Sequence, residues 1–96
     1  MRRITLREDG DLRYADVLRE VIRRPLDPKQ GADITELRQS IRVLDVLEAA
    51  NGTLELEDAD YDHLKRKLEA MTWNVVDKRV LRLVDEVTSA TETALL

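Results

Sequence analysis

The chain has 96 residues, a net charge of −4 and no cysteine, and 38% of its residues are charged. This length supports one domain, which we place over residues 1–96, and the missing cysteine excludes disulfides, zinc–thiolate sites and thiol catalysis. The acidic balance argues against a general nucleic-acid binder, and no apolar run reaches the ~20 residues of a membrane-spanning helix. We therefore expect a cytoplasmic protein without a membrane partner.

The first third of the chain predicts a strand followed by a helix. Residues 3–7 alternate polar and apolar side chains, which is the period of a half-buried strand, and residues 8–11 indicate a turn. Over residues 12–24, apolar side chains recur at spacings of three and four, which predicts a helix that Pro25 ends. A stiff loop with two prolines and one glycine follows, over residues 25–32.

The second predicted helix, between Asp33 and Gly52, is the most apolar part of the chain. Asp33 stands at its N-cap position with Glu36 three residues later, and Asn51-Gly52 suits a left-handed turn at its end. Its apolar side chains cover more than one stripe: Ile34, Leu37, Ile41, Val43, Leu44, Val46, Leu47 and Ala50. Because a helix this apolar is normally buried on two sides, we expect it at the centre of the fold. Ile41→Asp or Leu44→Asp should then unfold the domain.

The remaining residues predict one strand and two helices. Residues 53–57 alternate again, and we expect this strand to pair with the first one and to pack on the helices, because a bare two-stranded ribbon is marginal. A third helix begins at Asp58 or Asp60 and ends near Met71, with a narrow apolar seam. After a short break at residues 72–74, a fourth helix capped by Asn74 runs to about Ser89. Its inward side chains are Val76, Val80, Leu83, Val84 and Val87.

The predicted fold class is therefore α+β and mainly helical, with about four helices packed against one short two-stranded β-ribbon. For residues 91–96, which end in Ala-Leu-Leu, we expect a flexible or docking tail.

One acidic segment has the spacing of a calcium-binding EF-hand loop. Its four matching positions are Asp58, Asp60, Asp62 and Glu69. His63 stands where such a loop needs a glycine, and the same segment carries the apolar seam of the third helix. We therefore interpret the segment as an acid-rich helix start, which the helix dipole favours.

The other candidate catalytic residues are isolated in the sequence. His63, the single histidine, has charged neighbours that place it on a solvated helix face. Ser40 and Ser89 lie within or near the end of predicted helices, without the glycine-flanked turn of a serine nucleophile. We expect a protein with no catalytic residues, no metal and no cofactor.

Two sets of residues are candidates for binding a partner. The first combines an arginine-rich helix end with the tryptophan and the apolar tail: Arg19, Arg23, Arg24, Trp73, Leu95 and Leu96. Arginines suit acidic partners, and tryptophan is enriched at interface hot spots. Equally, the arginines can pair with the acidic middle of this chain, and Trp73 can fill the core between the last two helices.

The second set belongs to an alternative function, DNA binding by a helix-turn-helix made of the last two helices. Its bases are Lys78, Arg79 and Arg82. Acidic side chains on the same polar surface repel phosphates and disfavour this alternative: Asp77, Asp85 and Glu86.

Five short segments resemble those of small proteins encoded by tailed bacteriophages and prophages. They are Ile4-Thr5-Leu6, Pro25-Leu26-Asp27-Pro28, Ile41-Arg42-Val43-Leu44, Leu56-Glu57-Asp58 with Tyr61, and Trp73-Asn74-Val75-Val76-Asp77. The resemblance implies a non-enzymatic assembly factor or structural accessory that binds phage or host proteins in the host cytoplasm. From the surplus of apolar residues we also expect a homo-oligomer.

Overall fold

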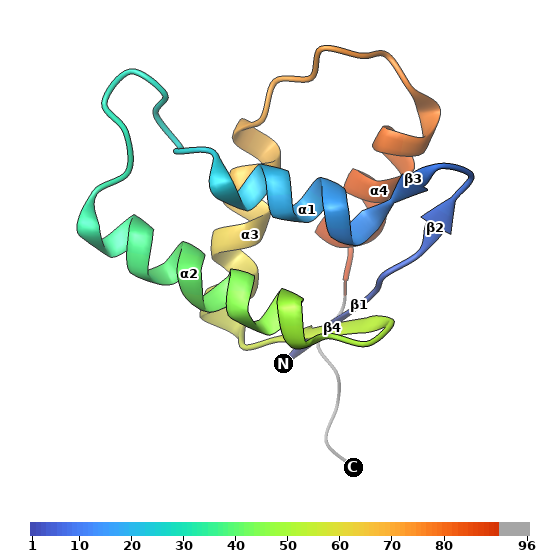
Figure 1. Cartoon of the computed structure of the whole chain (residues 1–96), viewed down its shortest axis with the longest axis horizontal. Coiled ribbons are helices and arrows are strands. Elements are labelled where there is room, and N and C mark those ends of the chain that lie inside the picture. Colours follow the sequence, from blue (N-terminus) through green and yellow to red (C-terminus); the bar gives the residue numbers. More distant parts are fainter. Residues whose placement is uncertain (91–96) are drawn as a thin grey trace.

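The computed structural model describes residues 1–90, which form four helices and two antiparallel pairs of strands (Figure 1). The elements in chain order are β1 (Arg2–Thr5), β2 (Glu8–Asp9), β3 (Leu12–Arg13), α1 (Tyr14–Arg23), α2 (Ile34–Ala49), β4 (Thr53–Leu56), α3 (Asp58–Ala70) and α4 (Lys78–Thr88). The predicted class, α+β and mainly helical, is confirmed. Residues 91–96, including Leu95 and Leu96, lie outside the described part.

The predicted ribbon is present, because β1 pairs antiparallel with β4 and sets Ile4 opposite Leu54. Alternate side chains of the two strands enter the core, as the period of two requires, and Ile4, Leu54 and Leu56 are each at most 3% exposed. A second ribbon, β2–β3, stands where we expected a simple turn and the first residues of a helix. Gly10 makes its tight turn possible with a φ of +67°, which glycine adopts without strain.

The centre of the fold is α3, not α2 as the sequence predicted. α3 packs against α1, α2, α4 and β4, and Figure 1 shows α1 crossing it on one side. Tyr61, Leu64 and Leu68 of its predicted seam are each at most 3% exposed. The bounds of α3 agree with the prediction, and they confirm that the EF-hand-like segment is an acid-rich helix start rather than a loop.

α2 is a peripheral helix, so the expectation of burial on two sides is wrong. Only Ser40, Val43 and Leu47 of α2 are buried, whereas Ile41 is 47% exposed and Leu44 is half-buried. One face of the helix contacts α1, α3 and β4, and no described element covers the other. The expectation that Ile41→Asp unfolds the domain is therefore withdrawn.

The N-terminus of α2 follows the prediction, but its C-terminus differs in detail. Asp33 Oδ1 accepts a hydrogen bond from the backbone N–H of Glu36 at 2.8 Å, which is the expected cap. At the other end, Ala50 leaves the helix in an extended conformation. Gly52, with a φ of +80°, makes the turn into β4 instead of ending the helix.

α4 begins three residues later than the predicted cap at Asn74 implies. Asp77 is the cap, and its Oδ1 accepts a hydrogen bond from the backbone N–H of Arg79 at 2.8 Å. Residues 71–77 thus form a connection longer than the predicted break. Val76 belongs to this connection and is fully exposed, contrary to the expectation that it points inward. The remaining inward positions are buried or half-buried as predicted: Val80, Leu83, Val84 and Val87.

Candidate protein-interaction surface

Large exposed aliphatic side chains gather on two faces of the described chain. The α2 surface consists of Ile34, Leu37 and Ile41. The α4 surface consists of the exposed Val75, Val76 and Leu81, together with the half-buried Trp73 and Val84 and the buried Val80 that line the same groove. Scattered exposed leucines and valines are normal on a small protein, but contiguous apolar surface is commonly a place of contact. These two surfaces are therefore the candidates for protein binding.

The α2 surface is a stripe along the outer side of the helix. Ile34, Leu37 and Ile41 are spaced by three and four residues, so they lie on one side, and they are 62%, 48% and 47% exposed. Arg38 and Asp45 flank the stripe on its solvent side and are exposed as well. The arrangement is an apolar centre with a charged edge, which is the usual composition of an interface.

The α4 surface is a shallow groove between α4 and the connection that precedes it. The groove encloses about 480 Å³. Val76 is fully exposed, while Val75 and Leu81 are 59% and 62% exposed. The groove exists because Asp77 starts the helix late, so that residues 73–76 run beside α4 instead of extending it.

Trp73 lies between the two positions that the sequence left open, the core and the surface. It is half-buried and packs against the hydrophobic core, and its remaining surface lines the groove of the α4 surface. Tryptophan with one face packed and one face accessible is a rigid contact residue, because little side-chain entropy is lost on binding.

Two of the three candidate arginines, Arg19 and Arg23 on α1, are paired within the chain, whereas Arg24 follows the helix. Arg19 lies 2.9 Å from a carboxylate oxygen of Glu48 on α2 and 3.0 Å from one of Asp16. Arg23 lies 3.7 Å from a carboxylate oxygen of Glu20 on its own helix. The alternative of pairing with the acidic middle segment is therefore realised by Arg19.

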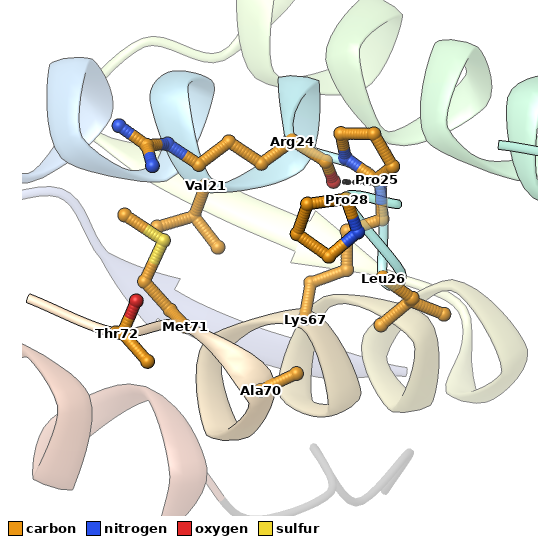
Figure 2. Close-up of a pocket in the computed structure, with 9 residues that line it drawn as sticks. All are labelled: Val21, Arg24, Pro25, Leu26, Pro28, Lys67, Ala70, Met71 and Thr72. Atoms are coloured by element: carbon orange, nitrogen blue, oxygen red, sulfur yellow. Dashed lines mark hydrogen bonds between the residues drawn. The ribbon is translucent and has the colours of Figure 1, made fainter. Parts of the chain in front are cut away.

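Arg24 and Lys67 line a second pocket, which is small and lies between α3 and the loop after α1. It encloses about 200 Å³, below the usual range of small-molecule sites. Figure 2 shows the side chain of Lys67 rising from α3 toward the main chain at Arg24 and Pro25. The remaining lining residues are mostly apolar: Val21, Leu26, Pro28, Ala70, Met71 and Thr72.

Lys67 belongs to a buried polar cluster that the sequence did not predict. Its Nζ donates hydrogen bonds to the carbonyl oxygens of Ile22 and Arg24, both at 2.8 Å. It also lies 3.1 Å from a carboxylate oxygen of Glu36, which accepts a hydrogen bond from the backbone N–H of Leu26 at 2.9 Å. The lysine thus satisfies carbonyl groups that the end of α1 leaves without helical partners.

His63 is buried beside this cluster, so its predicted place on a solvated face is wrong. Its Nε2 lies 2.9 Å from Ser40 Oγ, and the two residues are 3% and 7% exposed. Burial, followed by the nearby charge of Lys67, lowers the pKa of His63. We interpret the pair as structural, because both groups are shielded from solvent and each satisfies the other. The sequence did not predict the burial of His63, because charged neighbours along the chain do not indicate which helices cover a residue.

The bases of the DNA-binding alternative are largely neutralised by the chain itself. Arg79 forms ion pairs with Asp11 and Asp77 and donates to the carbonyl oxygen of Asp9 at 3.1 Å. Arg82 lies 2.6 Å from a carboxylate oxygen of Asp9. The hydrogen bonds from Arg79 hold the pKa of Asp77 below its ordinary value. Lys78 alone of the three bases forms no ion pair with another residue of the described part.

The family models, curated proteins and solved structures compared with this chain contain no match to it. Within residues 1–90, none of the helices combines the length and apolar character needed to cross a membrane.

Proposed function

We propose that this chain acts by binding another protein, as a small non-enzymatic assembly factor or structural accessory. The observation that carries the proposal is the α2 surface, where three neighbouring aliphatic side chains stay about half exposed or more. The resemblance to small proteins of tailed phages supports the same role. A phage or host protein in the cytoplasm is the partner that this resemblance suggests.

Covering the α2 surface would stabilise a complex appreciably. Full burial of an aliphatic side chain is worth about 1.5–3 kcal/mol, so three half-exposed ones offer roughly 2–4 kcal/mol. Arg38 and Asp45 at the edge carry opposite charges, and they would orient a partner more than they would strengthen its binding. The expected partner presents an apolar surface with polar edges.

Capture from native lysate, followed by mass spectrometry, tests the proposal when matched variants are compared. The triple variant Ile34→Ser/Leu37→Ser/Ile41→Ser should lose the protein that the unchanged chain captures. Leu81→Ser, which changes the α4 surface instead, should retain it. Circular dichroism must show both variants folded. Equal capture by the triple variant and the unchanged chain would contradict binding through α2.

The ion pairs around α4 favour protein binding over the DNA-binding alternative. A DNA-binding face needs bases that are free to meet phosphates, and Arg79 and Arg82 already meet carboxylates. A gel shift at low salt tests this, because phosphate contacts are strongest there. If the chain retards DNA in the gel and Lys78→Ala abolishes that retardation, the DNA-binding alternative is favoured instead.

A further inference from the structure

We propose that the α4 surface is a self-association site, where α4 pairs with α4 of a second copy in antiparallel orientation around a two-fold axis. This inference is independent of the partner proposed for α2. It rests on three features of α4 that the interior of the domain does not explain: an exposed leucine, two exposed charges without partners, and the position of those charges along the helix.

The apolar part of the contact centres on Leu81. This side chain is 62% exposed on the solvent side of α4, with the groove of Trp73, Val75 and Val84 along one flank. In a two-fold antiparallel pair, each flank of a helix meets the same flank of the second copy. Leu81 then lies beside Leu81 of the second copy. The two grooves join on the same flank and form one continuous apolar region.

The charges on α4 are complementary to themselves in this arrangement. Lys78 and Asp85 are exposed on the same side of the helix as Leu81, and neither forms an ion pair with another residue among residues 1–90. The midpoint between them falls between Leu81 and Arg82. A two-fold axis at that midpoint sets Lys78 opposite Asp85 of the second copy, and Asp85 opposite Lys78.

The same two charges are placed unfavourably for an isolated helix. Lys78 is the first residue of α4, at the positive end of the helix dipole, and Asp85 lies in the last turn, at the negative end. An antiparallel neighbour reverses both relationships, because each charge then lies beside the end of the second helix that attracts it. The unfavourable placement in one copy is thus favourable in a pair.

The α2 surface carries charges at the same spacing, because the exposed Arg38 and Asp45 stand seven residues apart with Ile41 between them. They lie outside the first and last turns of α2, where the helix dipole acts, so a second copy would relieve no unfavourable placement there. On α4 the exposed base nearest the axis, Arg82, already lies 2.6 Å from a carboxylate oxygen of Asp9. The dipole argument therefore favours α4 over α2 as the self-association site.

The pair should be weak and depend on concentration. One helix and one connection cannot bury the about 1,600 Å² of a standard interface, so we expect dissociation constants in the micromolar range or above. Sedimentation velocity of the full chain, from about 10 μM to about 1 mM at low salt, should show a shift toward the mass of two chains.

A charge exchange tests the register. Lys78→Asp and Asp85→Lys should each weaken association at least about ten-fold, because like charges then face each other twice. The double variant Lys78→Asp/Asp85→Lys should restore it, since both cross-axis pairs are again opposite. Leu81→Ser should abolish association, and Leu37→Ser on the α2 surface should leave it unchanged. Thermal melts confirm that each variant is folded.

The outcomes separate the possible occupants of the surface. A mass of one chain at every concentration overturns the inference, as does a dimer that Leu37→Ser disrupts and Leu81→Ser does not. Failure of the double exchange to restore a dimer that both single changes weaken also overturns it, because only a self-complementary contact is rescued this way. Loss of lysate capture in the α2 triple variant concerns the proposed function alone.

Discussion

The ammonium group of Lys67 lies 3.1 Å from the carboxylate of Glu36, and their side chains are only 3% and 11% exposed. This pair joins α3 to the first turn of α2, while the hydrogen bonds of Lys67 to Ile22 and Arg24 join both to the end of α1. Three helices therefore meet at one ammonium group. Its three hydrogens have three acceptors, so the buried group leaves no hydrogen-bond donor unsatisfied.

Removing Lys67 should be strongly destabilising. Lys67→Ala leaves a buried carboxylate without its counter-ion and the carbonyl oxygens of α1 without a donor, and such losses typically cost about 3–5 kcal/mol. Urea unfolding measures the change as a shift of the midpoint. Lys65→Ala on the same helix, which has no ion pair in the described part, is the control and should change stability by no more than about 0.5 kcal/mol. A loss in Lys67→Ala as small as that of the control would contradict the assigned role.

Folding stability should decrease as the pH falls below the ordinary pKa of histidine, 6.5, partly because of His63. Burial lowers the pKa of this residue in the folded chain. The unfolded chain therefore takes up a proton in a pH range where the folded chain does not, and proton uptake favours unfolding. The contribution of neutral His63 to folding stability is fully present above pH 6.5. It is lost as the pH falls toward the lowered pKa of His63 in the folded state. Measuring the free energy of unfolding against pH for the unchanged chain and for His63→Gln isolates this effect. Parallel curves for the two chains would exclude it.

Two identical substitutions on α2 should have very different effects. Leu47→Ala removes a side chain that is 3% exposed and should cost about 2–5 kcal/mol. Leu37→Ala truncates a side chain that is 48% exposed and should change stability by no more than about 0.5 kcal/mol. Chemical denaturation of both variants provides the comparison. Similar losses would mean that the outer side of α2 is covered in the isolated chain.

Arg79→Ala should loosen the β2–β3 ribbon where it meets α4, although the ion pair of Arg82 with Asp9 remains. The guanidinium contacts Asp9 and Asp11 of the ribbon and Asp77 at the helix cap, so its loss removes three charge-assisted contacts. Because the site is exposed to solvent, we expect only a modest loss of folding stability, which becomes smaller at high salt. Hydrogen exchange should increase selectively over residues 8–13, and Arg66→Ala, an exposed change on α3, should leave that exchange unaltered.

The sequence by itself determined most of the helices and the main ribbon of this protein, although not the β2–β3 ribbon or the start of α4. The alternation of residues 3–7 and 53–57 predicted two strands that pair, Asp33 predicted the start of α2, and the seam of Tyr61, Leu64 and Leu68 predicted α3. Each of these signals involves residues a few positions apart, and their physical cause acts over the same short range. The cap is a hydrogen bond to a residue three positions away, and the seams follow from the number of residues per turn.

Only the tertiary structure decided which surfaces are covered. Periodicity gave α2 more than one apolar stripe, but the docking of α1 and α3 buried Val43 and Leu47 and left Ile41 outside. The same docking enclosed His63 and Lys67, whose charged neighbours in the sequence suggested a solvated face. Burial depends on which helices pack together, and that depends on long-range contacts that no local pattern encodes. The exposed stripe of α2 and the groove beside α4, which carry the functional proposals, are consequences of that packing.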